Sequence, residues 1–190
     1  MGSRGKQILL IATFIPTCWL AFQLIHELGH VLAAMMSGGV VTKVVVHPLE
    51  ISRTDVAPNP YPLTVVWGGP VFGAVFPMAL LASALLLKLP GVFLFRFFAG
   101  FCLIGNGAYI GCGSFAKIGD AGVMLAHGSS IYLLWIFGIT CFVGGLIMWN
   151  GLGSYFGFGS QPKEIDNILP YSSLLVFISL FITLWMCSPT

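Results

Sequence analysis

The chain has 190 residues, of which 57% are hydrophobic and only 7% are charged, and its mean hydropathy is +0.97. These values lie outside the range of soluble globular proteins and are typical of a helical membrane protein. The net charge of +2 is spread over eight Lys and Arg residues and forms no basic patch of the kind that nucleic acids require, so we expect no nucleic-acid partner.

Apolar segments of about 20 residues, long enough to cross the hydrocarbon core of a bilayer, follow one another along the chain. The first is expected from about Ile8 to Met36 and ends at Ser37-Gly38-Gly39. The stretch from Val40 to Val66 differs, because it begins with several β-branched valines and continues with four prolines. This stretch predicts a short hairpin or irregular sheet rather than a membrane span.

Four further spans are expected after this stretch. They lie at about Trp67 to Leu87, Val92 to Cys112, Ile131 to Trp149 and Ile168 to Met186. We therefore predict an all-α polytopic membrane protein with about five transmembrane helices and a short membrane-associated β-hairpin between the first and second. Residues 1–190 are expected to form a single domain, with a core at 8–125 and additional helices at 129–150 and 168–187.

The residues most informative about chemistry lie in the first span, where His26-Glu27-Leu28-Gly29-His30 matches the pattern H-E-x-x-H. Residues four apart share one face of an α-helix, so His26 and His30 can present imidazole nitrogens to one zinc ion. The neighbouring Glu27 can take a proton from zinc-bound water and return it to the leaving amine. The pattern therefore predicts one Zn²⁺ per chain, with Glu27 as the catalytic base.

Ionisable residues cost free energy inside a bilayer and are usually functional there. The alternative for this cluster is a structural role, in which the two histidines donate hydrogen bonds to carbonyl groups of neighbouring helices.

A catalytic zinc usually has three protein ligands and a water, so one ligand must lie outside the motif. Asp120 follows the glycine-rich second half of the third span and is the leading candidate, because carboxylates are rare in this chain. Its alternative role is to cap a short helix from Ala121 to Ala126. Weaker candidates for the third ligand, all in loop segments, are His127, His47, Glu50 and Asp55.

The order of these features resembles the site-2 protease family of intramembrane zinc metalloproteases. The resemblance covers roughly Ile8 to Leu125 and includes the H-E-L-G-H sequence, the β-like stretch, a Gly-Gly-Pro and a glycine-rich span followed by Gly-Asp. It implies that His26 and His30 are zinc ligands, Glu27 is the catalytic glutamate and Asp120 is the third ligand. In the family an Asn, a Pro and an Asp-Gly usually lie close together, whereas here Asn106 precedes Asp120 by 14 positions without an intervening proline.

The resemblance also implies contacts with a substrate. Asn106 could help to hold a substrate strand or the oxyanion, with an interhelical hydrogen bond as its alternative role. Val44 and Val45 belong to the β-like segment, and an edge strand there could pair with an unwound substrate.

Together these features predict a multi-pass integral membrane protein that acts as an intramembrane zinc metalloendopeptidase. Its expected partners are the lipid bilayer and a membrane-protein or membrane-peptide substrate, cleaved in or near its transmembrane segment; the oligomeric state is unknown. One alternative is a non-proteolytic metal-binding membrane protein of the same fold, against which the intact Glu27 argues. Another is a small ion transporter lined by His26, Glu27, His30 and Asp120, for which an internal repeat would be expected and is not found.

Overall fold

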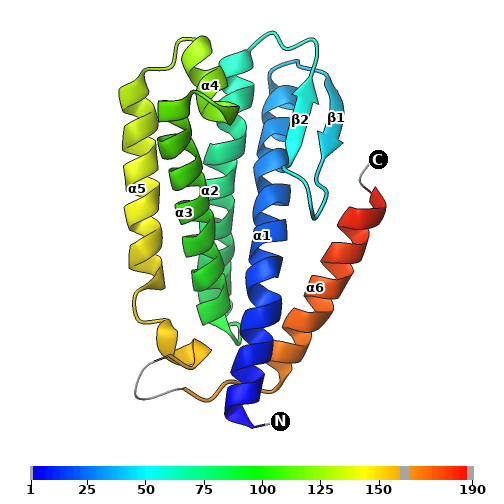
Figure 1. Cartoon of the computed structure of the whole chain (residues 1–190), viewed down its shortest axis with the longest axis vertical. Coiled ribbons are helices and arrows are strands. Elements are labelled where there is room, and N and C mark those ends of the chain that lie inside the picture. Colours follow the sequence, from blue (N-terminus) through cyan, green and yellow to red (C-terminus); the bar gives the residue numbers. More distant parts are fainter. Residues whose placement is uncertain (1, 159–162, 188–190) are drawn as a thin grey trace.

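The structure, a computed structural model, describes residues 2–158 and 163–187 (Figure 1). Within these ranges it contains six α-helices, two strands and one short 3₁₀ helix. They are α1 (Ser3–Met36), β1 (Val41–Val45), β2 (Arg53–Val56), α2 (Pro62–Leu86), α3 (Val92–Ala116), α4 (Gly119–Ala126), α5 (Ile131–Trp149), η1 (Gly153–Phe156) and α6 (Ile168–Cys187). Every α-helix except α4 is long and apolar enough to cross a membrane, which confirms the predicted fold class.

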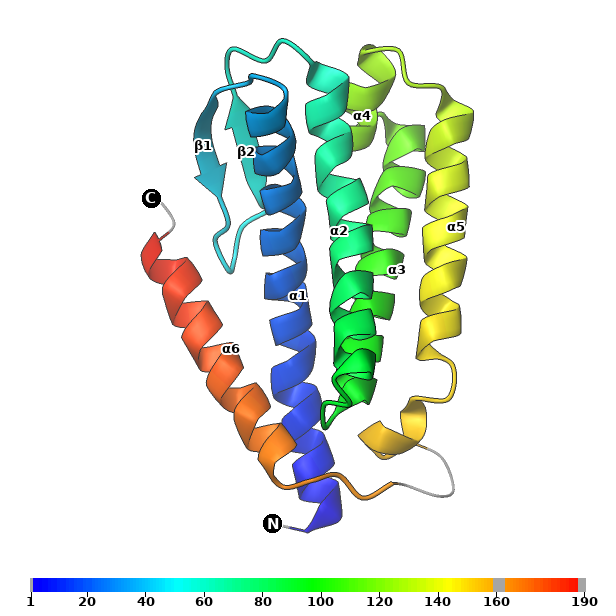
Figure 2. The same cartoon turned by 180° about the vertical axis from the view of Figure 1, so that it is seen from behind.

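The helices α1, α2, α3 and α5 lie side by side, and α6 slants away from α1 in both views (Figures 1 and 2). The short helix α4 and the β1–β2 hairpin lie at one end of this bundle, and the N-terminus lies at the other. We call the former the hairpin end. The second half of α1, which carries the H-E-x-x-H sequence, runs into this end.

Glycine allows α1 and α2 to approach closely beside the motif. A Cβ atom added to Gly68 in α2 would lie 2.6 Å from the carbonyl oxygen of Gly29 in α1. Backbones this close leave no room for side chains between them, as is common for helices packed in lipid. The helix α2 begins at Pro62, five residues before the predicted start at Trp67, because proline suits the first turn of a helix. This additional turn brings Val65 next to the motif.

The hairpin connects α1 to α2 and returns along α1. The chain leaves α1 through Gly38, whose φ of +76° is a conformation that favours glycine. The strands pair antiparallel, with Val41 opposite Val56 and Val45 opposite Arg53. The strand β2 lies between α1 and β1, so β1 is the outer strand (Figure 1).

A buried apolar cluster holds α4 in place at the hairpin end. Met124 of α4 is fully buried and packs with Val66 of α2, Ile110 of α3 and Leu134 of α5. Because α4 is only eight residues long, this packing rather than helix propensity determines where it lies. The cluster thereby positions Asp120 in the first turn of α4.

Candidate metal centre

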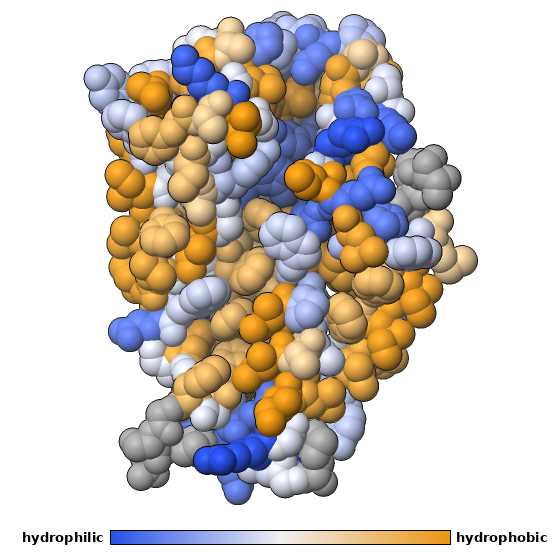
Figure 3. Space-filling view, in the orientation of Figure 1, coloured by the Kyte–Doolittle hydropathy of each residue, from blue (hydrophilic) through white to orange (hydrophobic). Residues whose placement is uncertain are grey.

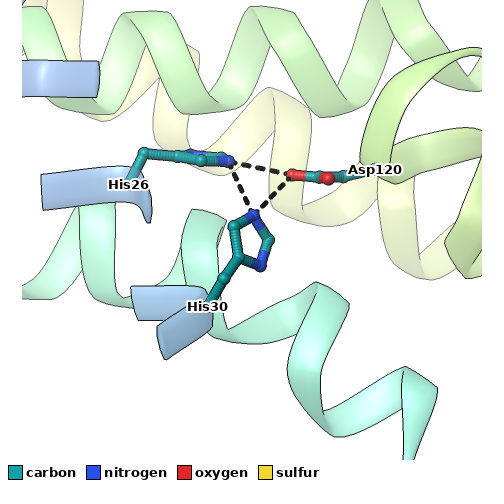
Figure 4. A group of neighbouring side chains, drawn as sticks. All are labelled: His26, His30 and Asp120. Atoms are coloured by element: carbon teal, nitrogen blue, oxygen red, sulfur yellow. Dashed lines mark hydrogen bonds and ion pairs between the residues drawn. The ribbon is translucent and has the colours of Figure 1, made fainter. Parts of the chain in front are cut away.

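The two motif histidines point into the bundle from one face of α1. His26 and His30 are 6% and 7% exposed, and their Nε2 atoms are 3.1 Å apart (Figure 4). The separation follows from the helix, which places residues four positions apart one above the other.

Asp120 approaches this pair from α4. Its Oδ2 atom lies 2.9 Å from Nε2 of His26 and 3.3 Å from Nε2 of His30, so the three donor atoms form a compact triangle (Figure 4). The alternative role of Asp120 as a helix cap is wrong: the N-cap of α4 is Ile118, and no side chain caps this helix. The backbone N–H of Asp120 donates instead to the hydroxyl oxygen of Tyr109 in α3.

The other nitrogen of each imidazole ring has a separate acceptor. Nδ1–H of His30 donates to the carbonyl oxygen of Val65 over 2.8 Å, and Nδ1–H of His26 donates to Oδ1 of Asn106 over 2.9 Å. The amide of Asn106 is oriented by its own Nδ2, which donates to the carbonyl oxygen of Cys102. In the neutral imidazoles both Nε2 atoms therefore carry lone pairs that point toward Asp120.

The electrostatics of the triangle call for a cation. Burial alone would raise the pKa of the Asp120 carboxyl, but its hydrogen bonds with His26 and His30 outweigh burial and lower this pKa to about 2. Asp120 is thus a carboxylate at neutral pH, and its hydrogen bonds to the two Nε2 atoms require protonated imidazoles. Where the imidazoles are neutral, the carboxylate faces two lone pairs instead, an arrangement that a cation between the three atoms satisfies. His26, His30 and Asp120 can hold a metal ion between them.

The alternative role for the histidines is structural, with both rings donating hydrogen bonds to carbonyl groups of neighbouring helices. His30 does donate to a carbonyl group of a neighbouring helix, as that alternative predicts. The same bond, however, fixes the ring so that Nε2 is directed at the other two donor atoms. Hydrogen bonds of this kind on the outer nitrogen are the usual supports of metal-binding histidines.

Glu27 is also buried and is held from the hairpin. Its side chain is 3% exposed, and Oε2 accepts a hydrogen bond of 2.6 Å from the hydroxyl group of Thr54 in β2. The hairpin is thus attached to α1 through the hydrogen bond between Thr54 and the Glu27 carboxylate.

His26, Glu27, His30 and Asp120 all line one cavity of about 930 Å³. The other lining residues come from α1, α2, α3, α4, the hairpin and the segment between β2 and α2. The space-filling view shows a hollow with a hydrophilic floor at the hairpin end (Figure 3). Apolar walls come from side chains such as Trp19, Phe22 and Val123. The cavity therefore combines a polar floor with walls suited to an apolar chain segment.

The predicted substrate-contact residues take different positions. Asn106 is fully buried and makes the interhelical bond to His26, which was its alternative role. Val44 and Val45 are in the outer strand and are not among the residues that line the cavity, whereas residues 51–57, which include β2, are. Their predicted contact with a substrate stays a prediction.

The weaker ligand candidates lie outside the triangle. His47 is 4.0 Å from Glu50, and its ring lies against Trp185. Asp55 lines the cavity, but its carboxylate pairs with Arg53 at 3.5 Å. His127 follows the last residue of α4.

Two side chains that contact Glu27 or Asp120 were not found from the sequence. Tyr109 could have been predicted, because it follows Asn106 by three positions and therefore lies on the same face of α3. Thr54 could not, because its contact with Glu27 depends on how the hairpin folds back on α1.

Comparisons of the chain with models of known protein families, with curated proteins and with solved structures found no match. A function must therefore be inferred from the chemistry of the site.

Proposed function

We propose that the chain is an intramembrane zinc metalloendopeptidase that hydrolyses a peptide bond in or near the transmembrane segment of a membrane protein or membrane peptide. The observation that supports this most is the convergence of His26, His30 and Asp120 beside Glu27 in one cavity. Two imidazoles and a carboxylate are a ligand set of catalytic zinc, which keeps a fourth position for water. The resemblance to the site-2 protease family implies the same activity.

The separations of the donor atoms fit zinc. Tetrahedral ligands with bonds of about 2.0 to 2.1 Å lie roughly 3.3 Å from one another. The three observed separations are 2.9, 3.1 and 3.3 Å, so the triangle needs to expand only slightly to accept the ion. Val65 and Asn106 accept hydrogen bonds from the Nδ1–H groups of the two histidines. The Nε2 lone pairs of the neutral imidazoles therefore already point toward the position of the ion.

Zinc bound by these residues would polarise the scissile carbonyl group and activate a water. Glu27 would accept the proton of that water and pass it to the leaving amine. The hydroxyl group of Thr54 holds the Glu27 carboxylate in one orientation during this transfer. A substrate segment packed against the apolar walls of the cavity would exclude bulk water and thereby strengthen the electrostatic interactions within it.

The position of the site suits a membrane substrate. His30 lies six residues, or about 9 Å, before the end of α1, so the triangle is inside the bundle but close to its hairpin end. Because five helices are long enough to span a bilayer, we infer a multi-pass integral membrane protein whose cavity lies near one membrane boundary. A peptide bond there can be reached once the substrate helix unwinds.

Metal content tests the proposal first. The detergent-purified protein is expected to contain about one zinc per chain by mass spectrometry, and His26→Ala, His30→Ala and Asp120→Ala are each expected to lose it. Glu27→Gln is the matched control: it should keep the zinc but cleave unfolded fluorescent casein 10²- to 10⁴-fold more slowly, about the range for loss of a general base. A wild-type protein that takes up no metal after zinc supplementation would refute the proposal.

A further inference from the structure

The wall of the cavity contains two buried polar atoms that form no hydrogen bond with the described part of the protein. In the part of the chain that the structure describes, only two buried side-chain nitrogen or oxygen atoms lack a hydrogen-bond partner, Nε2 of Gln23 and Oδ1 of Asn59. Both residues line the cavity that contains His26, Glu27, His30 and Asp120. Buried polar groups are almost always hydrogen-bonded, so these two atoms are available to ordered water or to a ligand in the cavity.

The free atom of Gln23 is a hydrogen-bond donor. Its Oε1 accepts the backbone N–H of Ser52 over 3.2 Å, which determines the orientation of the amide and leaves Nε2 without an acceptor. Gln23 is 3% exposed and precedes His26 by three positions and Glu27 by four, so the three side chains share one face of α1. The unpartnered donor is therefore rigidly held beside the proposed catalytic residues.

We propose that Gln23 and Asn59 form a subsite for the backbone of an extended peptide. In this subsite Nε2 of Gln23 donates to a peptide carbonyl oxygen, and Oδ1 of Asn59 accepts from a peptide N–H. The inference rests on the proposed peptidase function and adds to it the residues that bind the substrate backbone.

The chemistry of the substrate explains why such a pair is useful. Each peptide group presents one acceptor and one donor, and both must be satisfied when a helix unwinds away from bulk water. One donor and one acceptor in the wall meet this need without selecting any side chain. We therefore expect the subsite to bind peptides through the backbone, with side-chain preference set by the apolar walls.

Two zinc-binding probes separate the subsite from the metal. Acetohydroxamate contacts the metal alone, whereas acetyl-Leu-Ala-hydroxamate also carries a peptide backbone. Calorimetry on the zinc-loaded protein in detergent is expected to show tighter binding of the peptide probe. Gln23→Met, which keeps the length of the side chain but removes the donor, should weaken the peptide probe roughly fivefold to tenfold and leave acetohydroxamate unchanged.

A third probe requires no variant. An alkene isostere of the Leu-Ala bond keeps the extended geometry and removes both the carbonyl oxygen and the N–H. The wild type is expected to bind this probe more weakly than the peptide, and Gln23→Met should then cause little further loss. Asn59 lies outside α1, between β2 and α2. If Gln23→Met fails to fold, Asn59→Leu serves instead, and it should weaken the peptide probe while leaving acetohydroxamate unchanged.

The outcomes are distinguishable. If the wild type does not bind acetohydroxamate, the metal site fails and the subsite fails with it. If acetohydroxamate binds but the peptide probe binds no tighter than acetohydroxamate or the alkene probe, or Gln23→Met weakens all probes equally, the subsite is refuted while the metal site stands.

Discussion

At the scale of single residues, the site depends on groups that orient the candidate ligands and are not candidate ligands themselves. Asn106 is the clearest case. Its Oδ1 accepts a hydrogen bond from Nδ1–H of His26, while its Nδ2 donates a hydrogen bond to the carbonyl oxygen of Cys102. The imidazole of His26 is thus oriented by a residue from another helix. Partners of this kind usually change metal affinity by 10- to 100-fold.

We therefore expect Asn106→Leu to lower zinc affinity by about 10- to 100-fold, measured by competition with a fluorescent chelator. Asn106→Asp keeps an oxygen acceptor for His26 and should stay near the wild-type affinity. Unchanged zinc affinity in Asn106→Leu would show that this residue does not support His26, and would favour the role in substrate binding that the family resemblance implies.

Thr54 stands in the same relation to Glu27. Its hydroxyl group donates a bond of 2.6 Å to the buried carboxylate, and hydrogen bonds to charged groups contribute about 1.5 to 3 kcal/mol. Thr54→Val keeps the shape and removes the donor, so we expect casein cleavage to fall about tenfold or more while zinc content stays constant. Thr54→Ser keeps the hydroxyl group and is expected to remain close to wild type; equal losses in both variants would point to packing instead.

At the scale of the elements, glycines determine how closely the helices approach. The pair α3 and α5 shows this at two adjacent positions. A Cβ atom added to Gly145 would lie 2.6 Å from the carbonyl oxygen of Gly100, whereas one added to Gly144 would meet nothing closer than Leu103, at 3.9 Å. The two positions share a helix and differ in the face they occupy.

Gly145→Ala should accordingly destabilise the protein by about 1 to 3 kcal/mol, because the backbones of α3 and α5 must separate. Gly144→Ala is the matched control and should be neutral or slightly stabilising, since alanine favours the helix. Unfolding of the two variants in detergent, followed by circular dichroism, measures the difference. Similar stabilities would mean that the α3–α5 contact is looser than the structure indicates.

At the scale of the whole molecule, a bound metal would connect elements far apart in the sequence. His26 and Asp120 are 94 positions apart, and they bring α1 and α4 together. An ion that binds only the folded protein stabilises it by about 2.7 kcal/mol when its free concentration is 100 times Kd.

We expect removal of zinc with a chelator to lower Tm by about 5 to 10 °C, since 1 kcal/mol corresponds to about 2 to 4 °C in a protein of this size. His30→Ala should show the lower Tm with or without zinc. A Tm that does not respond to the chelator in the wild type would contradict a metal that bridges α1 and α4.

What the sequence determines by itself is local. The long apolar segments predict the five spans, because the length and hydropathy of a helix depend only on its own residues. The spacing of His26 and His30 places both on one face for the same reason. Asp120 could be selected as the candidate third ligand because few carboxylates compete with it in this chain.

Only the tertiary structure decides which distant groups meet. The donor atom of Asp120 reaches the histidines because Met124 packs into the cluster between α2, α3 and α5, a contact that no local pattern encodes. The bond of Asn106 to His26, that of Thr54 to Glu27 and the free amide of Gln23 likewise arise where separate segments pack together. These contacts depend on the packing of the whole chain, and local propensity cannot specify them.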